Sequence, residues 1–407
     1  MKVAVIGGGA AGYFAAISAK AHHSDSEVVI FEKTNKVLSK VKVSGGGRCN
    51  VTHACFDVKD LLQFYPRGGK LLKKALYEFN PNHTVAWFEG RGVPLKTEAD
   101  NRMFPITDSS QTIIDCLEQE VRKLGIRVSL SSAISAIRPL DHRFELAVNK
   151  EIIQVDKVIV TTGGSNKIEG YKWLQSLGHA IVPPAPSLFT FNMPSEEIRT
   201  LMGVVAPHAR VRVLGSKLEA TGPLLITHWG MSGPAVLKLS AFGAKWLAEK
   251  QYAFSVLVSW LGNTKEDECR VIFQEVISSS GNTMVSNWRN EWVPKRLWLF
   301  LLTKLEIDPS TKWNELGKKN SNRLINLLIN DEYRVSGKTT FKEEFVTCGG
   351  VDLSQVDPLT MESKVVPGLY FAGEVLDIDG VTGGFNFQAA WTTGFLAGKH
   401  VGTHARN

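Results

Sequence analysis

A glycine-rich turn follows the first apolar run of this chain and constrains the fold more than any other feature. Val3–Ile6 leads directly into the pattern Gly-x-Gly-x-x-Gly over residues 7–12, and an alanine-rich helix pattern comes next. In this pattern the first glycine permits a tight turn and the second lets the backbone approach a pyrophosphate. The third glycine lets the helix pack closely against the strand. The start of that helix offers N–H groups and a partial positive charge to phosphates.

A second strand and an acidic residue complete this pattern. Val28–Phe31 is typical of a buried strand, and Glu32 follows it, twenty residues beyond Gly12. A carboxylate at this place holds the ribose diol of an adenosine dinucleotide. The alternative is a glycine-rich turn in an ordinary βαβ unit, but strand, helix and acid in register favour dinucleotide binding. The residues expected to contact the dinucleotide are Gly7, Gly9, Ala10, Ala11, Gly12, Glu32 and Lys33.

The following residues alternate between helix and strand patterns. Residues 36–56 are glycine-rich and are expected to form a loop. Apolar periodicity predicts helices over 70–92 and 110–124. The pattern of residues 126–148 predicts a strand followed by a meander. An apolar strand over 155–160 ends in Gly163-Gly164, as expected at the edge of a ligand crevice.

The pattern changes after the proline-rich stretch 183–186, which marks a boundary. Residues 209–260 contain several strands and suggest a mainly antiparallel inserted domain. Residues 266–330 are helical, and residues 345–407 return to α/β character. Neither an internal repeat nor a low-complexity tract occurs in the sequence.

Composition narrows the classes of function. The 407 residues carry a formal net charge of +7, with 43% hydrophobic residues, as in a globular protein. The densest basic groups are Lys70, Lys73 and Lys74, and separately Lys318, Lys319 and Arg323. Each group is most simply a solvated helix face, so we expect a small-molecule substrate rather than a nucleic-acid partner. No apolar stretch is long enough to span a bilayer, and no group of residues has metal-ligand spacing, so we expect neither a membrane nor a metal.

A second glycine-rich element lies near the end of the sequence. Gly368–Gly373 reads as a strand that ends in Glu374, and Gly380–Gly384 leads into a helix that begins near Asn386. The glycines again allow the backbone to approach a ligand, and the helix aims its N–H groups at that ligand. Two such elements favour FAD over NAD alone, because a simple NAD dehydrogenase usually needs only the first.

Several longer motifs resemble one flavoprotein family along essentially the whole chain. These motifs are Ser44–Thr52 (Ser-Gly-Gly-Gly-Arg-Cys-Asn-Val-Thr), Arg102–Pro105, Thr227–Pro234, Pro294–Leu297 and Thr347–Gly384. They resemble the BaiN/YhiN-like, or aminoacetone-oxidase-family, NAD(P)/FAD-dependent oxidoreductases. The resemblance implies an α/β fold: a glutathione-reductase-like FAD-binding Rossmann domain with an inserted β-barrel and a helical subdomain. We expect these parts at 1–190 with 345–407, at 191–265 with 331–344, and at 266–330, respectively.

The resemblance also implies further cofactor contacts. They are Lys40, Ser44, Gly45, Gly46, Arg48, Asn50, Ile134, Thr162, Gly163, Gly373, Glu374, Gly383, Gly384, Phe385, Asn386 and Gln388. One departure concerns the loop over residues 165–170, which is shorter than in the family and lacks its Pro and Thr-Gly-Ser. If that loop shapes the substrate side of the flavin, the substrate of a family member cannot be transferred to this chain.

Cysteine spacing raises a rival interpretation. Disulfide reductases place a Cys-x4-Cys pair soon after their first FAD motif, whereas five residues separate Cys49 from Cys55. One extra residue turns the second sulfur by about 100° around a helix, so two unpaired thiols are favoured. The other cysteines are Cys116, Cys269 and Cys348. Five scattered cysteines suit a reducing compartment, and we expect a cytoplasmic protein.

We therefore expect an FAD-dependent oxidoreductase that transfers a hydride between flavin N5 and a small or medium organic substrate. The family resemblance suggests NAD(P)H-linked reduction of a C=C bond, or oxidation of an amine. Arg102 and His228 are candidates for binding an anionic group and for moving a proton, respectively. Two alternatives stay open: an FAD-containing RNA-modifying protein, and a flavin-binding scaffold without turnover. The sequence leaves the substrate, the electron donor and the oligomeric state undetermined.

Overall fold

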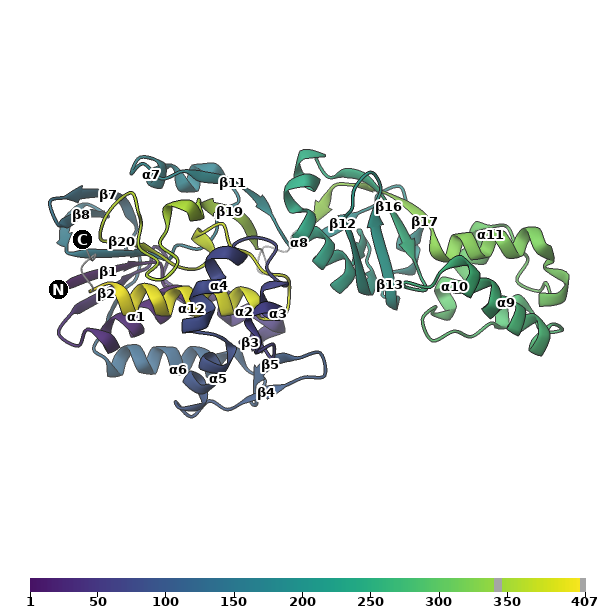
Figure 1. The fold of residues 1–407 in the computed structure, drawn as a ribbon, viewed down its shortest axis with the longest axis horizontal. Coiled ribbons are helices and arrows are strands. Elements are labelled where there is room, and N and C mark those ends of the chain that lie inside the picture. The colour runs from purple at the N-terminus through teal and green to yellow at the C-terminus, as the bar shows by residue number, and fades with distance from the viewer. Residues whose placement is uncertain (340–345, 403–407) are drawn as a thin grey trace. The chain divides into compact units, whose positions relative to one another are not determined.

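The computed structural model describes residues 1–339 and 346–402, which form two compact units (Figure 1). Unit 1 comprises Met1–Ser187 and Lys342–Asn407, and unit 2 comprises Leu188–Phe341. The expected boundary at 344/345 lies outside the described residues. The division of the middle of the chain into a barrel and a helical part stays a prediction.

A five-stranded parallel sheet forms the centre of unit 1 and confirms the expected Rossmann-type α/β fold. Its strand order is β20-β10-β1-β2-β6. The strands are β1 (Lys2–Ile6), β2 (Glu27–Phe31), β6 (Arg127–Ser129), β10 (Lys157–Val160) and β20 (Leu369–Phe371). Val3–Ile6, Val158–Val160 and β20 are buried, as expected for parallel strands covered on both faces. Asp156, which accepts from the Lys2 backbone N–H, separates β10 from the strand before it.

Two helices from opposite ends of the chain pack side by side in unit 1 (Figure 1). They are α1 (Ala10–His22) and α12 (Phe385–His400). A Cβ at Gly394 would lie 2.7 Å from the carbonyl oxygen of Ala11, and a Cβ at Gly398 would lie 2.2 Å from that of Ala15. The close approach of the helices therefore depends on glycine. Because these contacts advance together along both helices, α1 and α12 run in the same direction.

The remaining elements of unit 1 surround this centre. The helices are α2 (Ser39–Gly47), α3 (Val58–Leu62), α4 (Gly69–Glu78), α5 (Pro81–Glu89), α6 (Ser110–Lys123) and α7 (Lys172–Gln175). One antiparallel sheet has the order β3-β5-β4, with β3 (Thr52–His53), β4 (Leu95–Thr97) and β5 (Arg102–Pro105). A second is the expected meander β7 (Ile134–Leu140), β8 (Arg143–Val148) and β9 (Glu151–Val155). A third pairs β11 (Ile181–Pro186) with β19 (Thr347–Val351).

Two local expectations for unit 1 were wrong in detail. Part of the expected loop 36–56 forms α2, although Ser44–Gly46 has non-helical backbone angles inside it. The expected helix over 70–92 breaks where the Asn80 side chain caps α5 and Pro81 occupies its first position. The boundary expected at the proline-rich stretch 183–186 agrees with the end of unit 1 at Ser187, although the stretch itself lies within strand β11, whose pairing with β19 is irregular between Val182 and Ala185.

Unit 2 contains a seven-stranded sheet of order β17-β16-β13-β14-β15-β12-β18. Its strands are β12 (Thr190–Asn192), β13 (Val205–Val213), β14 (Glu219–Ile226), β15 (Gly230–Ser232), β16 (Ala253–Ser259), β17 (Asp331–Ser336) and β18 (Lys338–Thr339). Its helices are α8 (Pro234–Glu249), α9 (Glu266–Ser280), α10 (Lys295–Lys304) and α11 (Gly317–Ile329). The last three confirm the expected helical region, whereas α8 was missed because the strand pattern around it dominated the interpretation.

A buried polar cluster joins α10 to the sheet of unit 2. The side chain of Asp331 is fully buried and accepts hydrogen bonds from Trp260 Nε1 at 2.9 Å and Lys304 Nζ at 2.6 Å. Tyr333 Oη donates to the same carboxylate. None of the helices within residues 1–339 and 346–402 has the length and apolar character needed to cross a membrane.

The glycines of the α1–α12 contact give a stability prediction. Gly398→Ala places a Cβ against backbone atoms of α1, so we expect the free energy of unfolding to fall by about 3 kcal/mol. Gly69→Ala is the matched control, because Gly69 opens α4 and a Cβ there would lie 4.0 Å from the nearest atom, in Leu62. Denaturant unfolding followed by circular dichroism compares the two. Equal stability of Gly398→Ala and the wild type would contradict this account of the contact.

Candidate functional site

The predicted cofactor residues follow the carboxyl ends of neighbouring parallel strands. Gly7 follows β1, Glu32 follows β2, Thr162 follows β10, and Gly373 follows β20. The Gly7 N–H donates to Phe31 O at 2.8 Å, so the turn is tied to β2. In open α/β sheets, ligands bind at this edge, where the strand order reverses. The β1–β10 boundary is such a point, since the chain continues from β1 to β2 on one side and returns as β10 on the other.

The glycines of the first turn have different surroundings. Gly7 has φ +114°, and a Cβ there would lie 2.5 Å from Thr161 O. A Cβ at Gly12 would lie 1.9 Å from Gly7 O, so Gly12 is required for packing. Gly9, the N-cap of α1, has an ordinary extended conformation, and a Cβ there would meet no described atom within 4 Å. Within the described part of the chain no side chain caps α1, so its first N–H groups have no side-chain partner.

Glu32 is held by the backbone around it. Its Oε2 accepts from the Gly8 N–H at 2.9 Å, and its Oε1 accepts from the Thr34 N–H at 2.9 Å. The Ser132 N–H donates to Glu32 O at 2.8 Å. The predicted Ile134 follows Ser132 by two residues. Lys33, the next residue along the chain, is exposed. The structure therefore gathers the residues expected at the adenosine end of a dinucleotide.

Glu374 connects the ends of β10 and β20 with α2. Its Oε2 accepts from Lys40 Nζ at 2.5 Å, and its Oε1 accepts from the Thr347 N–H at 2.9 Å. A Cβ at Gly164 would lie 3.0 Å from the Glu374 carboxylate, so the backbone passes directly over it. The short loop 165–170 is fastened here, because the Ser165 N–H donates to Tyr171 Oη at 3.0 Å.

The signature segment Asn50–His53 lies against the glycine-rich turn before α12, some 330 residues later in the chain. His53 Nδ1 lies 3.0 Å from Gly383 O. The Asn50 amide, in the orientation that satisfies its neighbours, accepts from the Gly384 N–H at 3.0 Å. A Cβ at Gly384 would lie 2.6 Å from Thr52 O, and Gly384 has φ +93°. Thr52 Oγ1 donates to Gln388 Oε1 at 2.6 Å. The predicted Asn50, Gly383, Gly384 and Gln388 are thus brought together.

The start of α12 is shaped by its own side chain and by aromatic rings. Asn386 Oδ1 accepts from the Gly380 N–H at 2.8 Å, and Asn386 Nδ2 donates to Gly380 O at 2.9 Å. The ring of Phe385 stacks on Phe64 with centroids 4.4 Å apart, and its centroid lies 4.5 Å from that of the His53 ring. Burial lowers the pKa of His53, so its ring is neutral near pH 7. Sequence reasoning missed His53, whose signal was its place directly after the Arg-Cys-Asn-Val-Thr motif.

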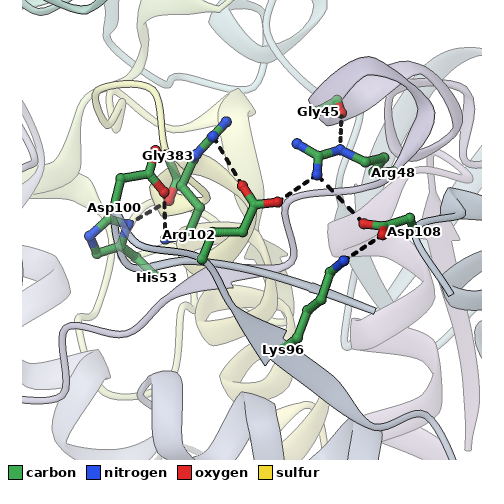
Figure 2. A network of polar contacts seen from close by, with 9 residues as sticks. Gly45, Arg48, His53, Lys96, Asp100, Arg102, Asp108 and Gly383 are labelled. Carbon is green, nitrogen blue, oxygen red and sulfur yellow. Dashed lines mark hydrogen bonds and ion pairs between the residues drawn. The ribbon is translucent and has the colours of Figure 1, made fainter. Parts of the chain in front are cut away.

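Arg48 belongs to a charged network on the sheet β3-β5-β4 (Figure 2). Its guanidinium donates to Glu98 at 2.6 Å and lies 3.5 Å from Asp108, and it sits 4.0 Å above the Phe104 ring. Arg102 donates to the same Glu98 at 3.1 Å and to Asp100 at 2.7 Å. The Lys96 ammonium pairs with Asp108. This balanced network orients both arginines, and Glu98 and Asp108 were missed because nothing in the sequence pairs them with Arg48.

The cysteines are not arranged like the redox pair of a disulfide reductase. All five cysteines are free thiols. Cys49 is completely buried, and burial raises its pKa to about 12. A thiol with so high a pKa is a poor nucleophile at neutral pH. The favoured interpretation of Cys49 and Cys55 as unpaired thiols is confirmed.

Two points remain: the place of the candidate residue His228, and whether the described residues could hold a metal ion. His228 is exposed at the tip of the β14–β15 hairpin in unit 2, where its ring lies 4.6 Å from that of Trp229. Its function as a proton donor stays a prediction. Within the residues that the structure describes, His, Cys, Asp and Glu side chains form no group able to hold a metal ion.

Comparison with known proteins supplies the family. Residues 1–400 match the family described as HI0933-like protein Rossmann domain. The chain is 27% identical over 406 residues to the 3-dehydro-bile acid delta(4,6)-reductase of Clostridium scindens, covering 98% of both chains. It is 30% identical over 406 residues to the ribosomal RNA dihydrouridine synthase of Escherichia coli K12, covering 98% of this chain and 97% of that one.

Solved structures of flavoproteins share the fold. A point variant of FrdA from the quinol fumarate reductase of E. coli matches with a TM-score of 0.52 and 14% identity, covering 100% of this chain and 72% of that one. The 3-ketosteroid delta1-dehydrogenase of Sterolibacterium denitrificans matches with a TM-score of 0.50 and 12% identity, covering 98% of both chains. The chain therefore belongs to the HI0933-like Rossmann family, whose members are FAD-dependent oxidoreductases.

Proposed function

We propose that this protein reduces a C=C bond conjugated to a carbonyl group, with FAD as its cofactor and NAD(P)H as the electron donor. The observation that carries the proposal is the chemistry shared by two relatives that the chain matches over nearly their whole length. One is named as a reductase of double bonds in a 3-oxo bile acid. The other is named for making dihydrouridine, in which the C5=C6 bond of uracil, conjugated to a carbonyl, has been reduced. Amine oxidation has no such support.

The residues present fit FAD. Beside the open Gly9 position, a Cβ at Gly163, Gly46 or Gly47 would also meet no described atom within 4 Å. These glycines leave room along the predicted path of the cofactor without any loss of packing. Gly7–Gly12 would hold the pyrophosphate, and Glu32 would hold the ribose. The start of α12, where no described side chain caps the helix, would face the flavin.

Bound FAD would take a hydride from NAD(P)H and deliver it to the carbon of the double bond farther from the carbonyl group. The protein must then hold the carbonyl oxygen and supply a proton to the neighbouring carbon. The N–H groups at the start of α12 favour negative charge near the cofactor. Arg102 is oriented by Glu98 and Asp100 and is the proposed partner of an anionic or carbonyl oxygen.

The open position at Gly9 predicts a variant that separates cofactor binding from folding. Gly9→Ala creates no clash within the protein, so the free energy of unfolding should stay within about 0.5 kcal/mol of the wild type. Its methyl group fills the proposed pyrophosphate cradle, so the dissociation constant for FAD should rise by about tenfold or more. Fluorescence titration of apoprotein with FAD measures the affinity.

Gly12→Ala is the contrasting control, because its Cβ would collide with Gly7 O and destabilise the fold itself. A stable Gly9→Ala variant that binds FAD as tightly as the wild type would contradict the proposed position of the pyrophosphate.

The reaction itself is tested with the FAD-loaded protein under anaerobic conditions. NADPH or NADH should bleach the flavin absorption, and a cyclic enone or a 3-oxo steroid with a conjugated double bond should restore it. Mass spectrometry of the product should show the gain of two hydrogens. Flavin that is reduced by amines and is not reoxidised by conjugated double bonds would reject the proposal in favour of amine oxidation.

Uridine in ribosomal RNA is the second candidate substrate, and a surface of unit 1 favours it. The exposed face of α4 carries Lys70, Lys73, Lys74 and Tyr77, while Leu72 and Ala75 are fully buried on the other face. Tyr77 is 60% exposed, and in the described chain these three lysines have no carboxylate within ion-pair distance. Unpaired lysines beside an exposed ring suit a polyanion that carries stacking bases.

A charge-neutralised α4 should distinguish this substrate. In Lys70→Gln/Lys73→Gln/Lys74→Gln, RNA affinity should fall by about tenfold, and the slope of log affinity against log salt should decrease by about two. Reduction of a small enone should not change, because these lysines lie outside the cofactor residues. Dihydrouridine in an unmodified ribosomal RNA fragment is measured by mass spectrometry.

Lys318→Gln/Lys319→Gln/Arg323→Gln removes the same charge from α11 of unit 2 and is the matched control. An equal loss of RNA binding in the control would mean that only net charge matters. Enone reduction without any RNA modification would restrict the function to small molecules.

A further inference from the structure

His53 provides a donor that holds the glycine turn at the start of α12. A carbonyl oxygen can only accept a hydrogen bond, so the hydrogen between His53 and Gly383 O must lie on Nδ1. The neutral ring then has its lone pair on Nε2, which leaves the Nδ1–H bond fixed as a donor. The turn is thereby held at Gly383 by the side chain of a residue distant in sequence.

His53 is itself held by a rigid base. It ends β3, where it pairs with Arg102 of β5. The residues just before it are bound to α12 as well: Trp391 Nε1 donates to Val51 O at 2.9 Å, and Thr52 bonds to Gln388. The backbone of His53 is therefore held by β5 and by α12 without any contribution from the bond between its ring and Gly383.

The opposite side of the turn is closed by other bonds. Asn386 bridges both backbone groups of Gly380, and Tyr65 Oη donates to Phe385 O at 2.7 Å. Gly383 and Gly384 lie between Gly380, which Asn386 holds, and Phe385, which Tyr65 holds. Both glycines have positive φ angles. Glycine has no side chain to fix it, so bonds from other segments select one position of this backbone: His53 donates to Gly383 O, and Asn50 accepts from the Gly384 N–H.

We propose that His53 is a positioning residue that fixes the Gly383–Gly384 turn, so that the N–H groups of α12 favour the reduced, negatively charged form of the flavin. This inference rests on the proposed position of the flavin beside that turn. The charged groups that face His53 are Asp100 and Arg102, and the rings packed on it are Phe64 and Phe385. The hydrogen bond and the ring packing can be separated by substitution.

Two variants make this separation. His53→Asn keeps a side-chain N–H donor near the Nδ1 position and loses the ring. His53→Phe keeps a ring to pack on Phe385 and loses the donor. His53→Ala removes both. If the donor fixes the turn, His53→Asn should behave like the wild type, and the other two variants should not.

The first measurement uses the apoprotein and does not depend on the flavin. Amide hydrogen exchange in the peptide 380–388 should become about tenfold faster in His53→Phe and His53→Ala, because one hydrogen bond is lost, and should change less than about twofold in His53→Asn. Wild-type exchange in His53→Phe, or equally fast exchange in His53→Asn and His53→Phe, would overturn the inference even if FAD binds elsewhere.

The second measurement uses the FAD-loaded protein. In His53→Phe the ratio of the dissociation constants for reduced and oxidised FAD should rise by about threefold, because the helix start no longer faces the negative charge. His53→Asn should retain the wild-type ratio. A changed exchange rate with an unchanged ratio in His53→Phe would overturn the link to the flavin, whereas failure of the wild-type protein to bind FAD would count against the proposed function itself.

Discussion

The close packing of α12 on α1 is the contact on which the rest of this structure depends. Gly394 and Gly398 let the last helix approach the backbone of the first to a distance that any side chain would prevent. The two helices run in the same direction, so their starts, which no described side chain caps, point to the same end of the sheet. Phe385 precedes Gly394 by nine residues, which places the start of α12 roughly 13 Å beyond that of α1.

Glycines at this site serve two purposes, which the surroundings of each position separate. Gly7, Gly12 and Gly384 are required by the protein, because a Cβ would collide with its own backbone. Gly9 is not required in this way, since it has an ordinary extended conformation and a Cβ there would meet open space. A residue that is small without a packing reason is better explained by a ligand. The open position at Gly9 is therefore stronger evidence for FAD than the packed Gly7 and Gly12, although all three belong to the same motif.

Local features of the fold were readable from the sequence, whereas contacts between distant segments were not. The path from β1 through Gly7–Gly12 to β2 was predicted because strand, turn and helix signals lie within a few residues of one another. The contact between His53 and Gly383 was not predicted, because 330 residues separate them and the sequence around each residue gives no sign of the other. Arg48 was predicted to face the flavin from the family motif alone. Its partners Glu98 and Asp108 become visible only when β5 folds beside β3.

Two glycine-rich turns, at opposite ends of the chain, form the two ends of one proposed FAD site. A crystal structure of the protein with FAD bound tests this claim most directly. We predict the pyrophosphate at the start of α1, a ribose on Glu32, and the isoalloxazine ring beside Gly383 and Gly384. A flavin ring bound away from the start of α12, or a pyrophosphate bound away from Gly9, would contradict the claim.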